Sequence, residues 1–141
     1  MKRKASAVWQ GGLKEGRGTL TTESGVLSTT PYSFSTRFED EKGTNPEELV
    51  GAGHAGCFSM QLAALLEKAG MTADKIETEA AVTLEKEGEG FAITSVHLDV
   101  AVAIPGGDKA KFEEIAQKAK EGCPISKLFN TKITMDAKLT S

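Results

Sequence analysis

The central segment of this chain is the feature that most constrains its fold. From Leu49 to Leu66 the sequence carries almost no charge and consists mostly of glycine, alanine, leucine and other apolar residues. The segment 43–48 before it has the signals of a helix start: an asparagine cap, a proline and two acids. We predict a helix that runs to about Ala69 and ends at Gly70. Because a helix that is apolar nearly all round is buried on most sides, it should form the centre of the fold.

Three glycines in this helix indicate a close neighbour. Gly51, Gly53 and Gly56 lie within six residues, and each costs a helix about 1 kcal/mol relative to alanine. A second helix or a sheet that approaches the glycine face closely would offset this cost. The one other long helix that the sequence predicts is amphipathic with a charged outer face. We therefore expect the neighbour to be the same helix of a second copy, in an intimate homodimer.

The rest of the chain predicts strands and one further helix. Residues 5–10 and 19–22 are expected as strands around a glycine-rich turn, and 31–38 as a half-buried strand that carries Arg37 on its polar face. Two long alternating runs around Gly88 to Gly90 predict a β-hairpin, 75–87 with 91–104. An amphipathic helix over 108–121 and a last strand over 131–139 complete a single α+β domain, 1–141, with a mostly antiparallel sheet.

Composition and charge exclude several classes of function. The chain is 39% hydrophobic and 26% charged, as is usual for globular proteins. Its net charge is −3 and no cluster of lysine and arginine is left without nearby acids, which argues against nucleic-acid binding. The first nine residues lack the apolar run of a signal peptide, and we expect no stretch to cross a bilayer. These features predict a cytoplasmic protein.

Two cysteines indicate the chemistry. Cys57 lies on the apolar helix among small residues, and Cys123 lies where the amphipathic helix stops before Pro124. They are 66 positions apart, far too many for a Cys-x-x-Cys pair, so only the fold could bring them together. In a reducing compartment, a cysteine pair is typically transient and catalytic. We interpret the pair as a thiol redox centre; the alternative is that Cys57 is a small buried hydrophobe and Cys123 an inert thiol at a helix end.

Long motifs along the whole chain resemble one known family. They are T-E-S-G-V-L at 22–27, F-S-T-R-F-E at 34–39, E-K-G-T-N-P-E-E-L-V-G-A-G-H-A-G-C-F-S-M at 41–60, F-A-I-T at 91–94 and Q-K-A-K-E-G-C-P-I-S at 117–126. Together they resemble the osmotically inducible protein C and organic hydroperoxide resistance proteins, and they are most similar to the osmotically inducible branch.

The resemblance implies an intertwined α+β homodimer that reduces organic hydroperoxides in stress defence, with no metal or organic cofactor. It implies that Cys57 attacks the peroxide and becomes a sulfenic acid, which Cys123 resolves to an intramolecular disulfide. A dithiol, for which the resemblance suggests a lipoyl group, would reopen that disulfide. It also implies an arginine that polarises the thiolate, Arg37, and a glutamate that holds this arginine, Glu47. Arg17 in the early glycine-rich turn competes with Arg37, which we prefer because it stands beside the T-N-P-E-E motif.

Physical chemistry sharpens these expectations. A buried apolar site raises a thiol pKa unless a cation is close, and arginine stays charged when desolvated and can bind a carboxylate with two hydrogen bonds. Apolar surroundings of Cys57 would favour an organic hydroperoxide over hydrogen peroxide. Ten positions separate Glu47 from Cys57, about 15 Å along a helix, which exceeds the reach of a glutamate side chain. If the two cooperate, one comes from the partner chain or the helix breaks.

Other interpretations of the same residues remain open. His54, one turn before Cys57, could make a Cys-His pair of a hydrolase or transferase, although a packed histidine is the favoured interpretation. Glu48 is expected to be a structural capping residue. A metal site of Cys57, His54 and Cys123 would lack a short-range ligand pair and is not expected. A different class is a non-catalytic stress protein that binds an apolar ligand in the dimer groove.

Overall fold

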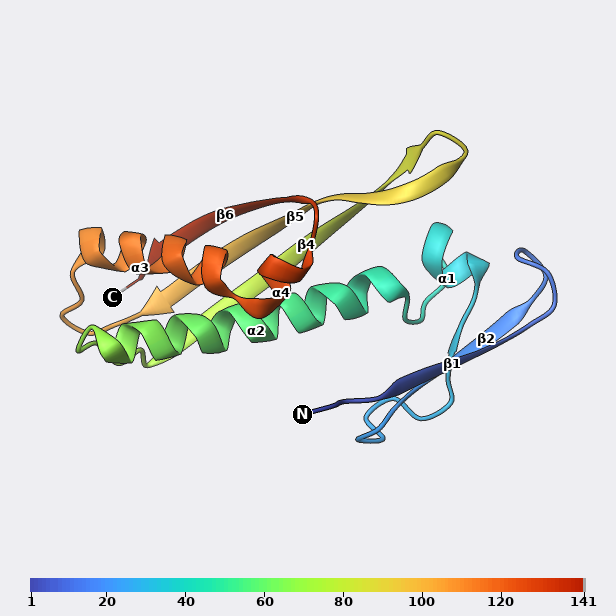
Figure 1. Ribbon diagram of the computed structural model, residues 1–141, viewed down its shortest axis with the longest axis horizontal. Helices are drawn as coiled ribbons and strands as arrows, with labels where there is room; N and C mark the ends of the chain where they lie inside the picture. The colour runs from blue at the N-terminus through green and yellow to red at the C-terminus, as the bar shows by residue number, and fades with distance from the viewer. Residues whose placement is uncertain (141) are drawn as a thin grey trace. The chain divides into compact units, whose positions relative to one another are not determined.

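The computed structural model describes residues 1–140 and divides the chain into two compact units, Met1–Leu49 and Val50–Ser141 (Figure 1). Each unit contains one three-stranded sheet, and residues 1–140 contain four helices in all. The predicted α+β class is confirmed.

The first unit is a small antiparallel sheet followed by one turn of helix. Its strands are β1 (Ala5–Gln10), β2 (Arg17–Thr22) and β3 (Thr30–Tyr32), paired in chain order. Helix α1 (Phe34–Phe38) follows directly. All six residues of β1 are exposed, and Gly16 and Gly18 alone are buried among residues 1–49. This unit therefore has almost no core of its own.

The predicted strand over 31–38 was wrong. The strand ends at Tyr32, because Ser33 opens helix α1 with a capping box. The Ser33 hydroxyl accepts a hydrogen bond from the backbone N–H of Thr36, whose own hydroxyl accepts one from the backbone N–H of Ser33. Arg37 consequently lies in the last turn of α1, and not on the polar face of a strand.

The long central helix is confirmed as α2 (Pro46–Lys68), a continuous helix of 23 residues. The Asn45 side chain accepts a hydrogen bond of 2.8 Å from the backbone N–H of Glu48, as a cap should. Gly70 ends the helix with a φ of +80°, a left-handed conformation that suits glycine. In the single chain α2 is buried on one face only; its buried residues are Gly51, His54, Phe58, Leu62 and Leu66.

The second unit packs helices against a mixed sheet. Strands β4 (Lys75–Glu87) and β5 (Gly90–Ala103) form the predicted hairpin, with a register irregularity between Thr83 and Leu84. Strand β6 (Lys132–Leu139) pairs with β5 in parallel. A parallel pair needs a crossover, which α3 (Lys109–Gly122) and α4 (Pro124–Leu128) supply. Helix α4 was not predicted: Pro124 begins a new helix directly after Cys123, since proline suits the first helical turn.

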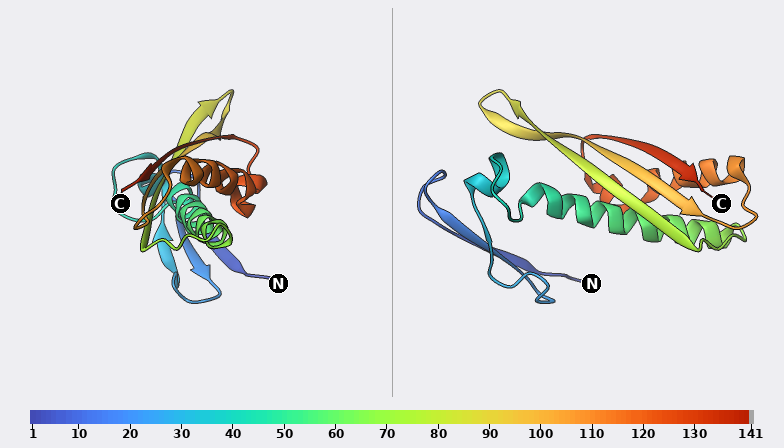
Figure 2. Two further views of the ribbon diagram at one scale, coloured as in Figure 1. Left: turned by 90° about the vertical axis from the view of Figure 1, so that its left-hand side faces the viewer. Right: turned by 180° about the vertical axis from the view of Figure 1, so that it is seen from behind.

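One face of this sheet is covered by α2 and α3, as the end-on and rear views show (Figure 2). Strand β5 points alternate side chains toward these helices, and together they form the core. Its fully buried large side chains include Phe58, Leu62, Leu66, Val96, Leu98, Val102, Phe112 and Cys123.

The glycines of α2 meet different neighbours. A Cβ added at Gly51 would lie 3.4 Å from the carbonyl oxygen of Ala80 and from Val82, so β4 is the close neighbour there. At Gly53 the nearest atom would be the Cδ1 of Ile125 in α4, at 3.5 Å. At Gly56 nothing lies within 4 Å. The close approach of the sheet therefore explains why position 51 is glycine. The second copy of the chain stays a prediction for the side of α2 at Gly56, where no neighbour lies within 4 Å.

The expectation that no stretch could cross a bilayer was wrong by length and composition. Helix α2 has an 18-residue window of mean hydropathy 1.4, which is enough to span a membrane. The core helix of a globular protein can have the same length and composition. Helix α2 places Phe58, Leu62 and Leu66, which have no exposed surface, in the core of the second unit.

Candidate active site

The two cysteines meet inside the second unit. Cys57 is in the middle of α2. Cys123 joins α3 to α4, since it is the C-cap of α3 and the N-cap of α4. Their Sγ atoms are 3.0 Å apart, and both are free thiols. Cys123 is fully buried, whereas Cys57 is half-buried. Because sulfur atoms in a disulfide are about 2.0 Å apart, an approach of about 1 Å would join the two.

The surroundings of Cys57 oppose ionisation of its thiol. Burial raises the pKa of Cys57, and the neighbouring Cys123 thiol raises it further. The backbone N–H of Ile125 in α4 opposes this shift, because its hydrogen bond stabilises the thiolate and lowers the pKa. A nucleophilic thiolate at this position would therefore need additional positive charge.

Arg37 and Glu47 form a bidentate ion pair in the first unit. The Arg37 Nη2 lies 2.7 Å from Glu47 Oε1, and its Nε donates to Oε1 and Oε2 at 3.1 and 3.2 Å. The Glu47 side chain is 13% exposed and that of Arg37 35%. A bidentate pair fixes the plane of the guanidinium group. The pairing of Glu47 with Arg37 favours Arg37 over Arg17, which begins strand β2 opposite Gln10.

Glu48 differs from its neighbour Glu47. Its backbone N–H donates to Asn45, and its carboxylate accepts a hydrogen bond of 2.8 Å from the Thr44 hydroxyl. These are contacts of a helix start, so the structural interpretation of Glu48 is confirmed.

Sequence reasoning missed an aromatic pocket beside Arg37. Its volume is about 230 Å³ and it lies within the first unit; the residues that line it are Trp9, Leu13, Tyr32, Ser33, Phe34, Arg37 and Phe38. The Trp9 and Tyr32 rings meet edge to face with centroids 5.4 Å apart. The pocket depends on α1, which gathers Phe34, Arg37 and Phe38 on one turn; a strand would have alternated them between two faces. The capping box at Ser33 was the signal that could have revealed it.

His54 is a packed histidine, as favoured. It is fully buried, and its Nε2 lies 2.8 Å from the Ser126 hydroxyl oxygen. Its ring meets Phe129 edge to face at 5.3 Å. Burial lowers the pKa of His54, so the neutral form is favoured. Since Nε2 is engaged by Ser126, a Cys-His nucleophile pair finds no support in this geometry. The other ring nitrogen, Nδ1, is buried and has no hydrogen-bond partner.

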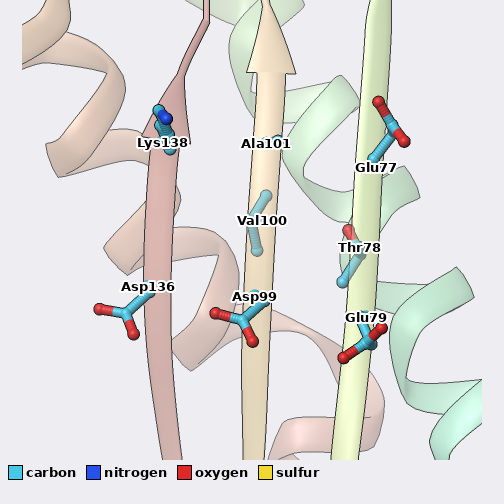
Figure 3. Close-up of a pocket in the computed structure, with 8 residues that line it drawn as sticks. All are labelled: Glu77, Thr78, Glu79, Asp99, Val100, Ala101, Asp136 and Lys138. Carbon is cyan, nitrogen blue, oxygen red and sulfur yellow. The ribbon is translucent and has the colours of Figure 1, made fainter.

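Within residues 1–140, the group with metal-ligand spacing contains neither cysteine. It comprises His97, Asp99 and Asp136. Figure 3 shows Asp99 and Asp136 side by side on β5 and β6, beside Glu79 on β4, with the helices behind. The His97 Nε2 lies 3.3 Å from Asp99 and 3.2 Å from Asp136, and its Nδ1 contacts the Thr134 hydroxyl.

Comparison with protein families and with curated proteins identifies relatives along the whole chain. The family model described as OsmC-like protein matches residues 39–138. Peroxiredoxin OsmC of Escherichia coli is 54% identical over 139 residues, which cover 99% of this chain and 97% of that protein. The organic hydroperoxide resistance protein OhrB of Bacillus subtilis is 31% identical over 86% of this chain and 87% of its own length.

Solved structures have the same fold. The crystal structure of OhrB from Bacillus subtilis superposes with a TM-score of 0.67 at 27% identity, and covers 97% of this chain and 98% of its own. An OsmC-like protein of unknown function from Vibrio cholerae reaches a TM-score of 0.77 at 19% identity, with 97% and 99% covered.

Proposed function

Because this chain belongs to the OsmC-like protein family, we propose that Cys57 and Cys123 form the redox centre of a peroxidase that reduces organic hydroperoxides to alcohols. The peroxidase role in stress defence follows from its relatives, a peroxiredoxin and organic hydroperoxide resistance proteins. The observation that carries the assignment to these residues is the 3.0 Å separation of the two sulfur atoms. One half-buried thiol and one fully buried thiol in contact suit an attacking and a resolving role.

The reaction proceeds in two steps. The Cys57 thiolate attacks the distal oxygen of the hydroperoxide; an S–O bond forms, the O–O bond breaks, and the alkoxide leaves and takes up a proton to give the alcohol. The Cys123 thiol then attacks the Cys57 sulfenic acid; an S–S bond forms, the S–O bond breaks, and hydroxide leaves with the thiol proton as water. The peroxide gains two electrons and the thiol pair loses two. A dithiol reductant, such as a lipoyl group, returns the pair to thiols by exchange.

Arg37 supplies the positive charge that the Cys57 site needs, and Glu47 holds it in place. The cation comes from a second copy of the chain: α2 is unbroken from Pro46 to Lys68, and the ten positions between Glu47 and Cys57 correspond to about 15 Å. The same guanidinium group would stabilise the thiolate before attack and the alkoxide as it leaves.

A homodimer is also supported by surface that one chain leaves uncovered. In the first unit, Val8 and Leu13 are 58% and 64% exposed, and Trp9 is 37% exposed. On the open side of α2, Met60 is 77% exposed beside Gly56. A unit of 49 residues with almost no core of its own needs other surface to cover its apolar side chains. We assign that role to a second copy of the chain. In the resulting dimer, residues 1–141 of each chain act as one functional domain. We propose the cytoplasm as its compartment.

The aromatic pocket supports an organic substrate. Its ring-lined walls beside Arg37 would bury the alkyl part of a hydroperoxide, and each buried CH₂ group gains about 0.8 kcal/mol. Hydrogen peroxide has no apolar part that could gain in this way. We therefore expect alkyl or fatty-acid hydroperoxides to react faster than hydrogen peroxide.

The same pocket favours one other function, a non-catalytic protein that binds an apolar ligand. Cysteine variants separate the two. Replacing Cys57 by serine removes the attacking thiol and should abolish consumption of cumene hydroperoxide. Cys123→Ser keeps the first step, so we expect one turnover followed by a stall and overoxidation of Cys57, measured by mass spectrometry. Unchanged peroxide consumption in Cys57→Ser would instead exclude the peroxidase centre described above.

A further inference from the structure

His54 joins the helix of the attacking cysteine to the helix of the resolving cysteine. Its Nε2, on α2, lies 2.8 Å from the Ser126 hydroxyl oxygen on α4. Ser126 comes three residues after Cys123, and it directly follows Ile125, whose backbone N–H bonds the Cys57 sulfur. His54 is fully buried and Ser126 is 8% exposed. This bond therefore connects the two elements whose relative position sets the sulfur geometry.

Helix α4 depends on such an attachment. It has five residues, and a helix this short has little stability of its own in water. Ser126 is its one buried residue. Apolar contacts with α2 also hold it: Ile125 lies against Gly53, and the Phe129 ring after α4 meets the His54 ring. The hydrogen bond of Ser126 with His54 adds a directional contact between side chains of α4 and α2, outside the pair of cysteines.

The unpaired nitrogen of His54 strengthens this point. A neutral imidazole carries one hydrogen, so with Nδ1 unpartnered, one polar atom is buried without a hydrogen bond in either tautomer. Burial of an unpaired polar atom costs free energy that an apolar side chain at the same place would avoid. A histidine at this position therefore lowers the stability of the fold relative to an apolar residue. The contact of its Nε2 with Ser126, three residues after Cys123, is a functional reason for a histidine here.

We propose that His54 is a positioning residue for disulfide formation, which holds α4 through Ser126 so that Cys123 and the Ile125 N–H stay at the Cys57 sulfur. The inference rests on the proposed function. In the step it assists, the Cys123 sulfur attacks the Cys57 sulfenic acid, the S–S bond forms, the S–O bond breaks and water leaves. His54 exchanges neither protons nor electrons in that step; it sets the distance over which the sulfurs react.

The test uses four variants of the full-length chain. His54→Leu and Ser126→Ala each remove the bond, and the second removes a single oxygen atom. His54→Gln is the conservative variant, because the glutamine amide nitrogen can reach the Ser126 hydroxyl. Ser59→Ala is the matched control: the Ser59 hydroxyl, also on α2, bonds that of Thr78 on β4 at 2.7 Å, so this variant loses a comparable bond that does not touch α4.

Rapid mixing with one equivalent of cumene hydroperoxide, followed by acid quench and mass spectrometry, separates sulfenic acid formation from disulfide formation. Loss of one buried hydrogen bond shifts a local equilibrium by roughly tenfold. We expect disulfide formation to slow about tenfold in His54→Leu and Ser126→Ala, with more sulfinic acid at Cys57 at higher peroxide. His54→Gln and Ser59→Ala should form the disulfide at the rate of the unmodified protein.

Equilibration with reduced and oxidised glutathione provides a readout that needs no peroxide. The ratio of intramolecular disulfide to dithiol should fall about tenfold in the first two variants and stay unchanged in the other two. Unchanged disulfide rates and ratios in both His54→Leu and Ser126→Ala would overturn the inference. If the unmodified protein forms no disulfide with peroxide, the proposed function fails, whereas the glutathione ratios still decide whether His54 positions Cys123.

Discussion

At the residue scale, Cys57 is under two opposing demands. Attack on a peroxide needs a thiolate, yet burial and the Cys123 thiol raise the pKa of Cys57. The Ile125 N–H provides part of the compensation, and we assign the rest to Arg37. The activity should therefore depend on pH through ionisation of the Cys57 thiol, which the fixed positive charge of Arg37 favours.

Substitution of Arg37 by methionine tests this assignment. Without the cation, the pKa of Cys57 should rise, so a higher pH is needed to form the thiolate. The acid limb of the pH–rate profile should therefore shift to higher pH. A nearby opposite charge is worth about 1–3 pKa units, which predicts a loss of roughly ten- to a thousandfold in rate at pH 7. Stopped-flow rates with cumene hydroperoxide from pH 5 to 9 measure the shift.

Arg17→Met is the control, since Glu47 pairs with Arg37. It should retain the profile of the unmodified protein. If the pH–rate profile shifts in Arg17→Met and stays unshifted in Arg37→Met, the activating cation is Arg17 and the assignment to Arg37 is wrong.

The candidate residues were predictable from sequence to different degrees. Cys57, Cys123, Arg37 and Glu47 stand in long motifs, and the structure brings together the two cysteines and, separately, the ion pair. The hydrogen bond that holds α4 on α2 was not predictable, because the contact of His54 with Ser126 joins positions 72 apart and depends on a helix that the sequence pattern did not reveal. Local patterns in the sequence report on residues that are near one another along the chain, and His54 and Ser126 are far apart.

At the element scale, the short helices α1 and α4 were not predicted from the sequence. The alternation of aromatic and polar residues over 31–38 favoured a strand, but a capping box at Ser33 determined a helical turn. Pro124 was interpreted as a stop for the preceding helix, whereas it begins α4. The long elements α2, β4 and β5 were predicted with nearly the observed bounds, because many periodic positions agree within each of them.

The contact between α2 and β4 is the element-scale prediction. Gly51→Val would place two methyl groups beyond a Cβ that already lies 3.4 Å from Ala80 and Val82, so we expect a loss of about 1–3 kcal/mol in the free energy of unfolding. Urea denaturation measures it. Gly53→Val is the matched control, since the one neighbour within 4 Å is the flexible end of Ile125. An equal loss in both variants would mean that the approach of β4 does not select glycine at position 51.

At the scale of the whole molecule, the four residues that we assign to catalysis belong to different units. Cys57 and Cys123 belong to the second unit, and Arg37 with Glu47 belongs to the first. We propose that the Arg37 of a second copy completes each site. A test of this division must distinguish residues of one chain from residues of its partner.

Mixed dimers of two inactive variants make that distinction. A dimer of one Cys57→Ser chain with one Arg37→Met chain has one complete site if the residues come from different chains, and none if they come from the same chain. With random pairing, half of the dimers are mixed and each has one of two sites, so co-expression should restore about a quarter of the activity. Assay of the co-expressed mixture with cumene hydroperoxide measures this value, and mixed dimers purified through two different tags should have about half of the activity. Activity no higher than that of the two parent variants would show that the site lies within one chain.

The most direct measurement of the central claim is the thiol balance of a single turnover. Fully reduced protein is mixed rapidly with one equivalent of cumene hydroperoxide or of hydrogen peroxide, and thiols and mass are determined after quenching. Our account predicts the loss of two thiols per chain, a mass lower by two hydrogens in an intramolecular Cys57–Cys123 disulfide, and faster reaction of the organic peroxide. Slow oxidation at the same rate with both peroxides, without that disulfide, would contradict it.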